Sequence, residues 1–167
     1  MPGWANLAIG DCLSELHHLG ERIDQYDRHI AQMAKNDERS QRLMAMPGIG
    51  EKTATALLAS IGNGHDFKCG RQLAAWLGLV PGQYSSGGKQ RLGRITKAGD
   101  SYLRNLLILG ARAVLVASKN KSDRLSRWAQ SVEQRCGYWK AVVAIAAKNA
   151  RMVWAMLNKG EAFKPMS

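Results

Sequence analysis

A heptad repeat of apolar side chains occupies the first forty residues, and only a helix can gather such a repeat on one face. The apolar positions alternate at spacings of three and four: Ile9, Cys12, Leu16, Leu19, Ile23, Tyr26, Ile30 and Met33. Because such a seam is typically buried against another helix, residues 1–39 are predicted to form a coiled-coil-like arm. A second copy can supply the partner helix, so we expect a homo-oligomer. The alternative is one long helix that packs its stripe on the body of the same chain.

Residues 42–62, RLMAMPGIGEKTATALLASIG, predict two short helices joined by a tight hairpin. Gly48 and Gly50 permit a turn whose backbone N–H groups point outward at the start of the second helix. The segment resembles the helix-hairpin-helix module, which grips DNA phosphates without reading sequence, and Lys52 is placed to add a cation there. The alternative is a helical hairpin that serves only for packing.

The rest of the chain, residues 40–167, predicts a helical domain, since no stretch shows the clean alternation of a strand. The expected fold is therefore all-α. A helix that begins at Asp100 or Ser101 is predicted to be the central core helix, because it carries a broad apolar surface. The large aromatic side chains of the later helices are interpreted as core residues rather than base-stacking residues: Trp128, Trp139 and Trp154.

Positive charge is concentrated in the later part of the chain. Residues 1–66 carry 6 Lys+Arg and 9 Asp+Glu, whereas residues 67–167 carry 18 and 4, which gives the whole chain a net charge of +11. This asymmetry predicts a polyanionic partner, with nucleic acid the first choice. A third hypothesis is that the chain is an oligomerising scaffold whose positive charge serves solubility.

Other residue patterns exclude several classes of site. The three cysteines form no C-x-x-C pair and the four histidines lack the spacing of metal ligands, so neither a disulfide framework nor a metal site is expected. No stretch is apolar for long enough to cross a bilayer. We therefore expect a cytoplasmic protein with no membrane partner.

Residues 81–99 are predicted to form a basic loop that glycines keep out of helical conformation. Ser85 and Ser86 precede a run of cations on this loop and on the helix that follows: Lys89, Arg91, Arg94, Lys97 and Arg104. A serine hydroxyl is a poor nucleophile unless a base or surrounding positive charge supports its ionised form and the developing charge on phosphorus. The loop matches neither a hydrolase G-x-S-x-G elbow nor a P-loop. From the residues alone a phosphate-contacting loop is favoured, and a catalytic loop stays open.

Three segments in this order, MPGIGEKTATALLASIG, GLVPGQYSSGGK and ITKAGDSYLR, resemble the C-terminal domain of the insertion-sequence one-hundred-and-ten family of transposases, which are RNA-guided DNA recombinases. The resemblance extends from about Arg42 onward, and the heptad arm resembles the coiled coil that precedes that domain. It implies a catalytic serine at Ser86, with Ser85 as the alternative. The serine would attack a DNA phosphodiester and form a phosphoserine link without ATP.

The resemblance also implies the partners and the contacts. DNA and a guide (bridge) RNA are the expected partners, and the expected DNA-binding residues are Gly48, Gly50, Lys52, Lys89, Arg91, Arg94, Lys97 and Arg104. Members of the family carry an N-terminal RuvC-like domain whose acidic quartet binds Mg²⁺. The carboxylates after residue 66 are few and cannot stand in for that quartet: Asp100, Asp123, Glu133 and Glu161.

The sequence is therefore interpreted as a fragment that keeps the serine and the DNA-binding parts and lacks the RuvC-like domain. We expect no cofactor in this chain, and Mg²⁺ only in the full-length protein. On its own the chain is expected to bind nucleic acid and to recombine nothing. The competing hypothesis is a non-enzymatic helix-hairpin-helix module that binds DNA independently of sequence.

Overall fold

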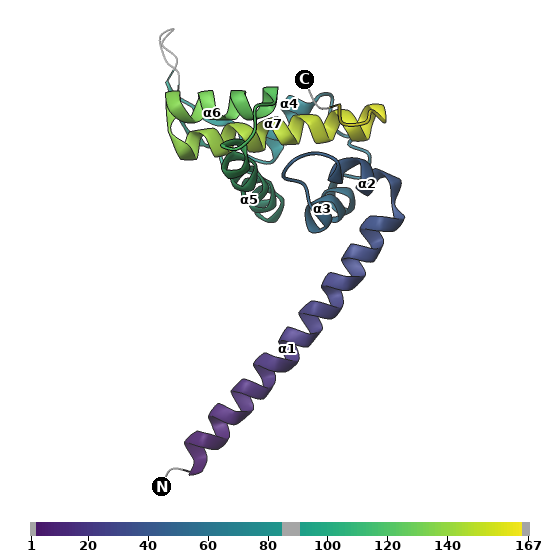
Figure 1. The fold of residues 1–167 in the computed structure, drawn as a ribbon, viewed down its shortest axis with the longest axis vertical. Helices are drawn as coiled ribbons and strands as arrows, with labels where there is room; N and C mark the ends of the chain where they lie inside the picture. Colours follow the sequence, from purple (N-terminus) through teal and green to yellow (C-terminus); the bar gives the residue numbers. More distant parts are fainter. Residues whose placement is uncertain (1–2, 85–90, 165–167) are drawn as a thin grey trace.

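Seven helices and one pair of short strands form the part of the chain that the computed structural model describes, residues 3–84 and 91–164 (Figure 1). This composition confirms the predicted all-α class. In chain order the elements are α1 Gly3–Asn36, α2 Glu38–Met44, α3 Glu51–Ile61, α4 Gly70–Trp76, β1 Pro81–Gln83, β2 Leu92–Ile95, α5 Ser101–Ser118, α6 Arg124–Cys136 and α7 Tyr138–Lys159.

Aspartate side chains cap the N-termini of α2, α5 and α6. Asp37 accepts a hydrogen bond from the backbone N–H of Arg39, and Asp123 accepts one from the N–H of Ser126. Asp100 accepts from two N–H groups in the first turn of α5. Each carboxylate satisfies donors that a helix terminus leaves without partners, so these helices begin where the sequence supplies the cap. Of the two predicted caps of α5, the structure uses Asp100.

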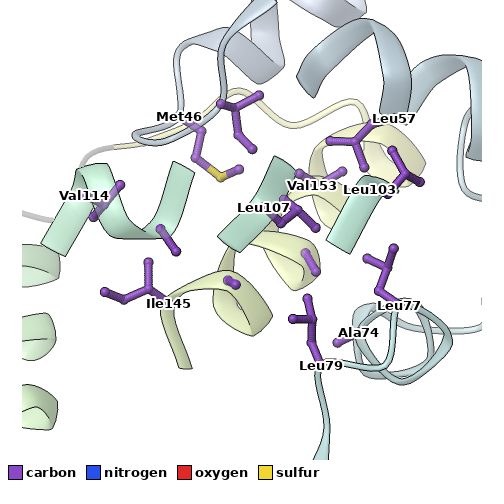
Figure 2. Close-up of a cluster of buried hydrophobic side chains, with 14 of the residues drawn as sticks. Met46, Leu57, Ala74, Leu77, Leu79, Leu103, Leu107, Val114, Ile145 and Val153 are labelled. Carbon is purple, nitrogen blue, oxygen red and sulfur yellow. The ribbon is translucent and has the colours of Figure 1, made fainter. Parts of the chain in front are cut away.

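Helix α7, rather than α5, is the centre of the body. It contacts α2, α4, α5 and α6, and its buried face contains the small residues Ala141, Ala146 and Ala150. Figure 2 shows how side chains from the α2–α3 hairpin, α4, α5 and α7 meet in one core, with Leu107 of α5 beside Val153 of α7. The prediction that α5 is the central helix was wrong, because small side chains let neighbouring helices approach α7 closely.

The aromatic residues are less buried than predicted. Trp128 and Trp154 are half-buried, and the indole N–H of Trp154 donates to the carbonyl of Phe67 at 2.9 Å. Trp139 is 64% exposed, which contradicts its assignment to the core. It lies in the first turn of α7, where the guanidinium of Arg112 is 5.8 Å from its ring centroid.

Helix α1 projects away from the body as a single long rod (Figure 1). It contacts α2 and α3 near its C-terminal end, and Ala34 is its buried residue. The predicted seam is open to solvent along most of its length; Leu16 is 65% exposed and Ile23 is 59% exposed. The alternative in which this stripe packs on the body of the same chain is therefore wrong.

Residues predicted as an irregular loop contain a pair of antiparallel strands. Pro81 pairs with Ile95 and Gln83 pairs with Leu92, and a bulge between these pairs places one extra residue on β2. These strands were not predictable from the sequence, because strands of three and four residues with no buried face lack apolar alternation. Within the described residues, no helix is long and apolar enough to cross a membrane.

Candidate nucleic-acid interface

Two glycines hold the base of the strand pair against the body. Gly78 follows α4 and Gly99 precedes α5, and both have positive φ, +69° and +67°. A Cβ atom at Gly78 would collide with the backbone of Ala98, and one at Gly99 would collide with the carbonyl oxygen of Trp76. The chain entering the strand pair and the chain leaving it are therefore in direct backbone contact, which glycine alone permits.

Arg104 of α5 donates hydrogen bonds to the backbone at the junction where the chain enters and leaves the strand pair. Its Nη1 donates to the carbonyl oxygen of Ala98 at 2.8 Å and to that of Leu77 at 3.2 Å. The sequence predicted Arg104 as a DNA contact, and the structure places it beside the cationic strand pair with this nitrogen bonded to the backbone. Guanidinium–carbonyl bonds of this kind fix local geometry. A positioning role for Arg104 follows directly from these contacts.

Hydrogen bonds continue along the strand pair. The N–H of Thr96 donates to the carbonyl of Val80 at 3.0 Å, and the N–H of Tyr84 donates to the carbonyl of Arg91 at 2.9 Å. Tyr84 and Arg91 are the residues on either side of the segment 85–90, and this hydrogen bond pairs them with each other. The predicted nucleophile Ser86, its alternative Ser85 and the predicted DNA contact Lys89 lie in 85–90, outside the described residues.

The ring of Tyr84 packs across the glycines of the strand pair. A Cβ atom at Gly93 would lie 2.9 Å from Cε2 of Tyr84, and one at Gly82 would lie 3.7 Å from the same atom. The absence of side chains at these glycines leaves room for the aromatic ring beside the backbone, although the Tyr84 side chain stays exposed. Tyr84 directly precedes the two serines, and sequence reasoning had assigned it no role.

The strand pair and its base carry positive charge on exposed side chains. Arg91, Arg94 and Lys97 are exposed. In the described ranges, no carboxylate lies within ion-pair distance of these three cations. Cations that have no internal partner are available to neutralise phosphates of a bound strand.

The α2–α3 hairpin is positioned by packing. Gly48 has φ +84°, and a Cβ atom there would lie 2.8 Å from both the carbonyl oxygen of Gly110 and a methyl carbon of Val114. The carbonyl of Pro47 accepts a hydrogen bond from the side chain of the fully buried Asn149 at 3.2 Å. Gly48 thus faces α5. Gly50, the N-cap of α3, is exposed and has no neighbouring atom within 4 Å of an added Cβ.

Lys52 is paired within the chain. Its Nζ lies 2.7 Å from Oδ2 of Asp27 on α1, and this hydrogen bond raises the pKa of Lys52. The pair joins the arm to α3 at the start of that helix. The role of Lys52 as a DNA contact stays a prediction, and its charge already has a partner in this conformation.

The described residues do not fit the metal that the resemblance implies. Among residues 3–84 and 91–164, no three His, Cys, Asp or Glu side chains lie close enough together to hold a metal ion. Mg²⁺ is held by oxygen ligands, chiefly carboxylates.

The described part of the chain is thus a helical body that carries an anchored, exposed cationic strand pair. The sequence pattern of the Transposase IS116/IS110/IS902 family matches residues 40–127, more than half of the chain, and the chain belongs to this family.

Individual relatives agree with this assignment. The chain is 50% identical over 151 residues to a probable family 20 transposase of Pseudomonas aeruginosa, covering 90% of this chain and 45% of the relative. It is 44% identical over 155 residues to the transposase for insertion sequence element IS1111A of Coxiella burnetii, covering 92% and 43%. A pilin gene-inverting protein of Moraxella bovis is 27% identical over 154 residues, covering 89% and 47%. The chain thus spans about half the length of the curated relatives it matches.

Proposed function

We propose that this chain is the DNA-contacting and serine-bearing part of an insertion-sequence transposase that acts in DNA transposition and recombination. The observation that carries the proposal is the anchored strand pair. It holds Tyr84 and Arg91 at the two ends of the segment that contains Ser86, and it exposes Arg91 and Arg94. The match to the transposase family and the names of the relatives support the same role.

In the proposed reaction the hydroxyl oxygen of Ser86 attacks a DNA phosphorus atom. A serine–phosphorus bond forms, the bond from phosphorus to a bridging sugar oxygen breaks, and the released sugar hydroxyl takes up the proton that the serine gives up. A DNA hydroxyl later reverses these exchanges on a new strand, so no ATP is consumed. Arg91 and Arg94 contribute by positioning the phosphate and by stabilising the charge on its non-bridging oxygens.

The full assembly is part of the same proposal. The resemblance implies that a guide RNA chooses the DNA sites and that acidic residues of a RuvC-like domain, outside this chain, supply a Mg²⁺ site. The exposed seam of α1 suits pairing with the same helix of a second copy. On its own, the chain is proposed to bind DNA and to recombine nothing.

Duplex binding tests the DNA-contacting surface. Arg91→Gln with Arg94→Gln removes two cations, and each phosphate contact contributes about 0.9 to the slope of log affinity against log salt. We expect the slope for duplex DNA to fall by about 1.8. The matched control is Arg28→Gln with Lys35→Gln, two cations on the arm. An unchanged slope in the strand-pair variant would show that the strand pair is not the DNA-binding surface.

Adduct formation tests the chemistry. The chain would be joined to the N-terminal segment of its Pseudomonas aeruginosa relative and incubated with nicked donor DNA, guide RNA and Mg²⁺. We expect a covalent protein–DNA adduct that Ser86→Ala abolishes while DNA affinity is kept. Loss of the adduct in Ser85→Ala instead would move the nucleophile to Ser85.

A second candidate function is a non-enzymatic module that binds DNA through the α2–α3 hairpin. The exposed Gly50 at the N-terminus of α3 favours it, because phosphates can approach an open backbone closely. In that case Gly50→Val would weaken duplex binding more than Arg91→Gln with Arg94→Gln, and no adduct would form.

A further inference from the structure

A second group of cations lies on the face formed by α6 and α7, and none of them belongs to the predicted DNA-binding residues. The side chains of Trp128, Lys148, Arg151, Met152 and Ala155 line a hollow of about 450 Å³ between these two helices. Arg124 lies one helical turn before Trp128 on α6. No residue of the strand pair contributes to this hollow.

Lys148 lies close enough to the other two cations of this face to feel their charge. Burial lowers the pKa of Lys148, and the positive charges of Arg151 and Arg124 lower it further. The ammonium of Lys148 lies 4.3 Å from the ring centroid of Trp128, a cation–π contact. In the part of the chain that the structure describes, Arg124, Lys148 and Arg151 have no carboxylate within ion-pair distance. The approach of an external anion would lower the electrostatic free energy of such a cluster.

Part of the lining of the hollow is apolar, whereas a site that binds phosphate alone needs only cations and polar donors. Met152 and Ala155 offer apolar surface on which a flat aromatic group can lie, beside the ring of Trp128 and the Lys148 ammonium that lies over it. A duplex presents mainly phosphates to such a hollow, because its bases are stacked and paired. A single strand can place a base on the apolar lining and its phosphates on the cations.

We propose that the α6–α7 face formed by Arg124, Trp128, Lys148 and Arg151 is a binding site for single-stranded nucleic acid, separate from the duplex-binding strand pair. The site holds one base on its apolar lining and pairs the flanking phosphates with the three cations. It does not depend on Ser86 or on covalent chemistry.

Binding of short oligonucleotides to the 167-residue chain tests the site. The test variant is Lys148→Gln with Arg151→Gln. The control variant is Arg28→Gln with Lys35→Gln. Arg28 is a matched choice because, like Arg151, it donates a hydrogen bond to the carbonyl four residues earlier in its own helix. Each cation contributes about 0.7 to the salt slope for a single strand, so we expect the slope to fall by about 1.4 and affinity about tenfold. Lys148→Arg with Arg151→Lys keeps both charges and is expected to bind as the wild type does.

The probes are a single-stranded RNA, a single-stranded DNA of the same sequence and a duplex DNA. If the affinity for one of the two single strands, RNA or DNA, depends more on the cluster, that strand is assigned as the ligand of this site. Equal loss for duplex and single strands would overturn the proposal, because it would indicate a general phosphate surface. An unchanged single-strand affinity in the Gln variant would overturn it as well.

Photo-cross-linking with an oligonucleotide that carries 5-iodouracil locates the strand. We expect cross-links on the tryptic peptide 128–135, which begins with Trp128. They should persist in Arg91→Gln with Arg94→Gln, so that this test and the test of the strand pair fail independently. Cross-links confined to other peptides would contradict the site.

Discussion

The guanidinium of Arg104 on α5 lies 2.8 Å from the carbonyl oxygen of Ala98, at the base of the strand pair. We expect Arg104→Met to destabilise the fold by about 1–3 kcal/mol, since the part-buried carbonyl of Leu77 loses its charged donor together with the exposed carbonyl of Ala98. Arg94→Met, at an exposed position, serves as the control and should leave stability unchanged. Urea denaturation measures both. Unchanged stability of Arg104→Met together with weaker DNA binding would show that Arg104 contacts DNA instead of clamping the junction.

The contact between Gly48 and Gly110 predicts a steric effect. A Cβ atom at Gly110 would collide with the carbonyl oxygen of Gly48, so Gly110→Ala should destabilise the body by about 1–3 kcal/mol. Gly20→Ala is the matched control, because Gly20 also lies inside a helix and has nothing within 4 Å of an added Cβ. The control should raise helix content in circular dichroism and cost no stability. Equal urea midpoints for Gly110→Ala and wild type would contradict the packing of the hairpin on α5.

The cap of α2 predicts a pH dependence. The hydrogen bond from the side chain of Arg39 lowers the pKa of Asp37 from its ordinary 3.8 to about 2. Since the folded pKa is the lower one, the charge contributes stability above about pH 4 and loses that contribution as pH falls toward 2. Asp37→Asn keeps a good cap without the charge. The stability difference between the two proteins, under about 1 kcal/mol at pH 6 for this partly exposed pair, should shrink over that window in urea titrations. A pH-independent difference would contradict the assignment.

The exposed seam of α1 predicts self-association. Leu16→Glu with Ile23→Glu places charges on the seam, and we expect it to shift sedimentation equilibrium from oligomer to monomer. Gln25→Glu with Gln32→Glu adds the same charge away from the seam and should leave the oligomer intact. If the unmodified chain is monomeric at high concentration, the homo-oligomer is excluded.

Features that local sequence determines were predictable. The heptad spacing indicated α1 and the position of Asp100 indicated the start of α5, because periodicity and capping depend on neighbouring residues. The strand pair was missed because its short, exposed strands carry no apolar alternation. The central position of α7 was missed because its buried face is rich in alanine, whereas the large side chains of α5 gave the stronger hydrophobic signal.

The candidate site was predictable in its charge but not in its geometry. The cationic run 89–97 indicated phosphate binding from composition alone. The sequence could not separate Arg104, whose guanidinium bonds backbone carbonyls, from the exposed Arg94, because both are arginines beside the same loop. It likewise could not show that Lys52 pairs with Asp27, a contact across 25 positions in sequence.

Disulfide trapping on DNA tests most directly whether the strand pair presents residue 86 to a DNA phosphate. In a chain with Cys12, Cys69 and Cys136 changed to serine, Ser86→Cys would be mixed with duplex DNA that carries a thiol tether on one phosphate, and Ser131→Cys on the exposed surface of α6 would serve as the reference. The account predicts rapid cross-linking at residue 86, slowed when Arg91 and Arg94 are changed to glutamine. Cross-linking at 86 no faster than at 131 would contradict it.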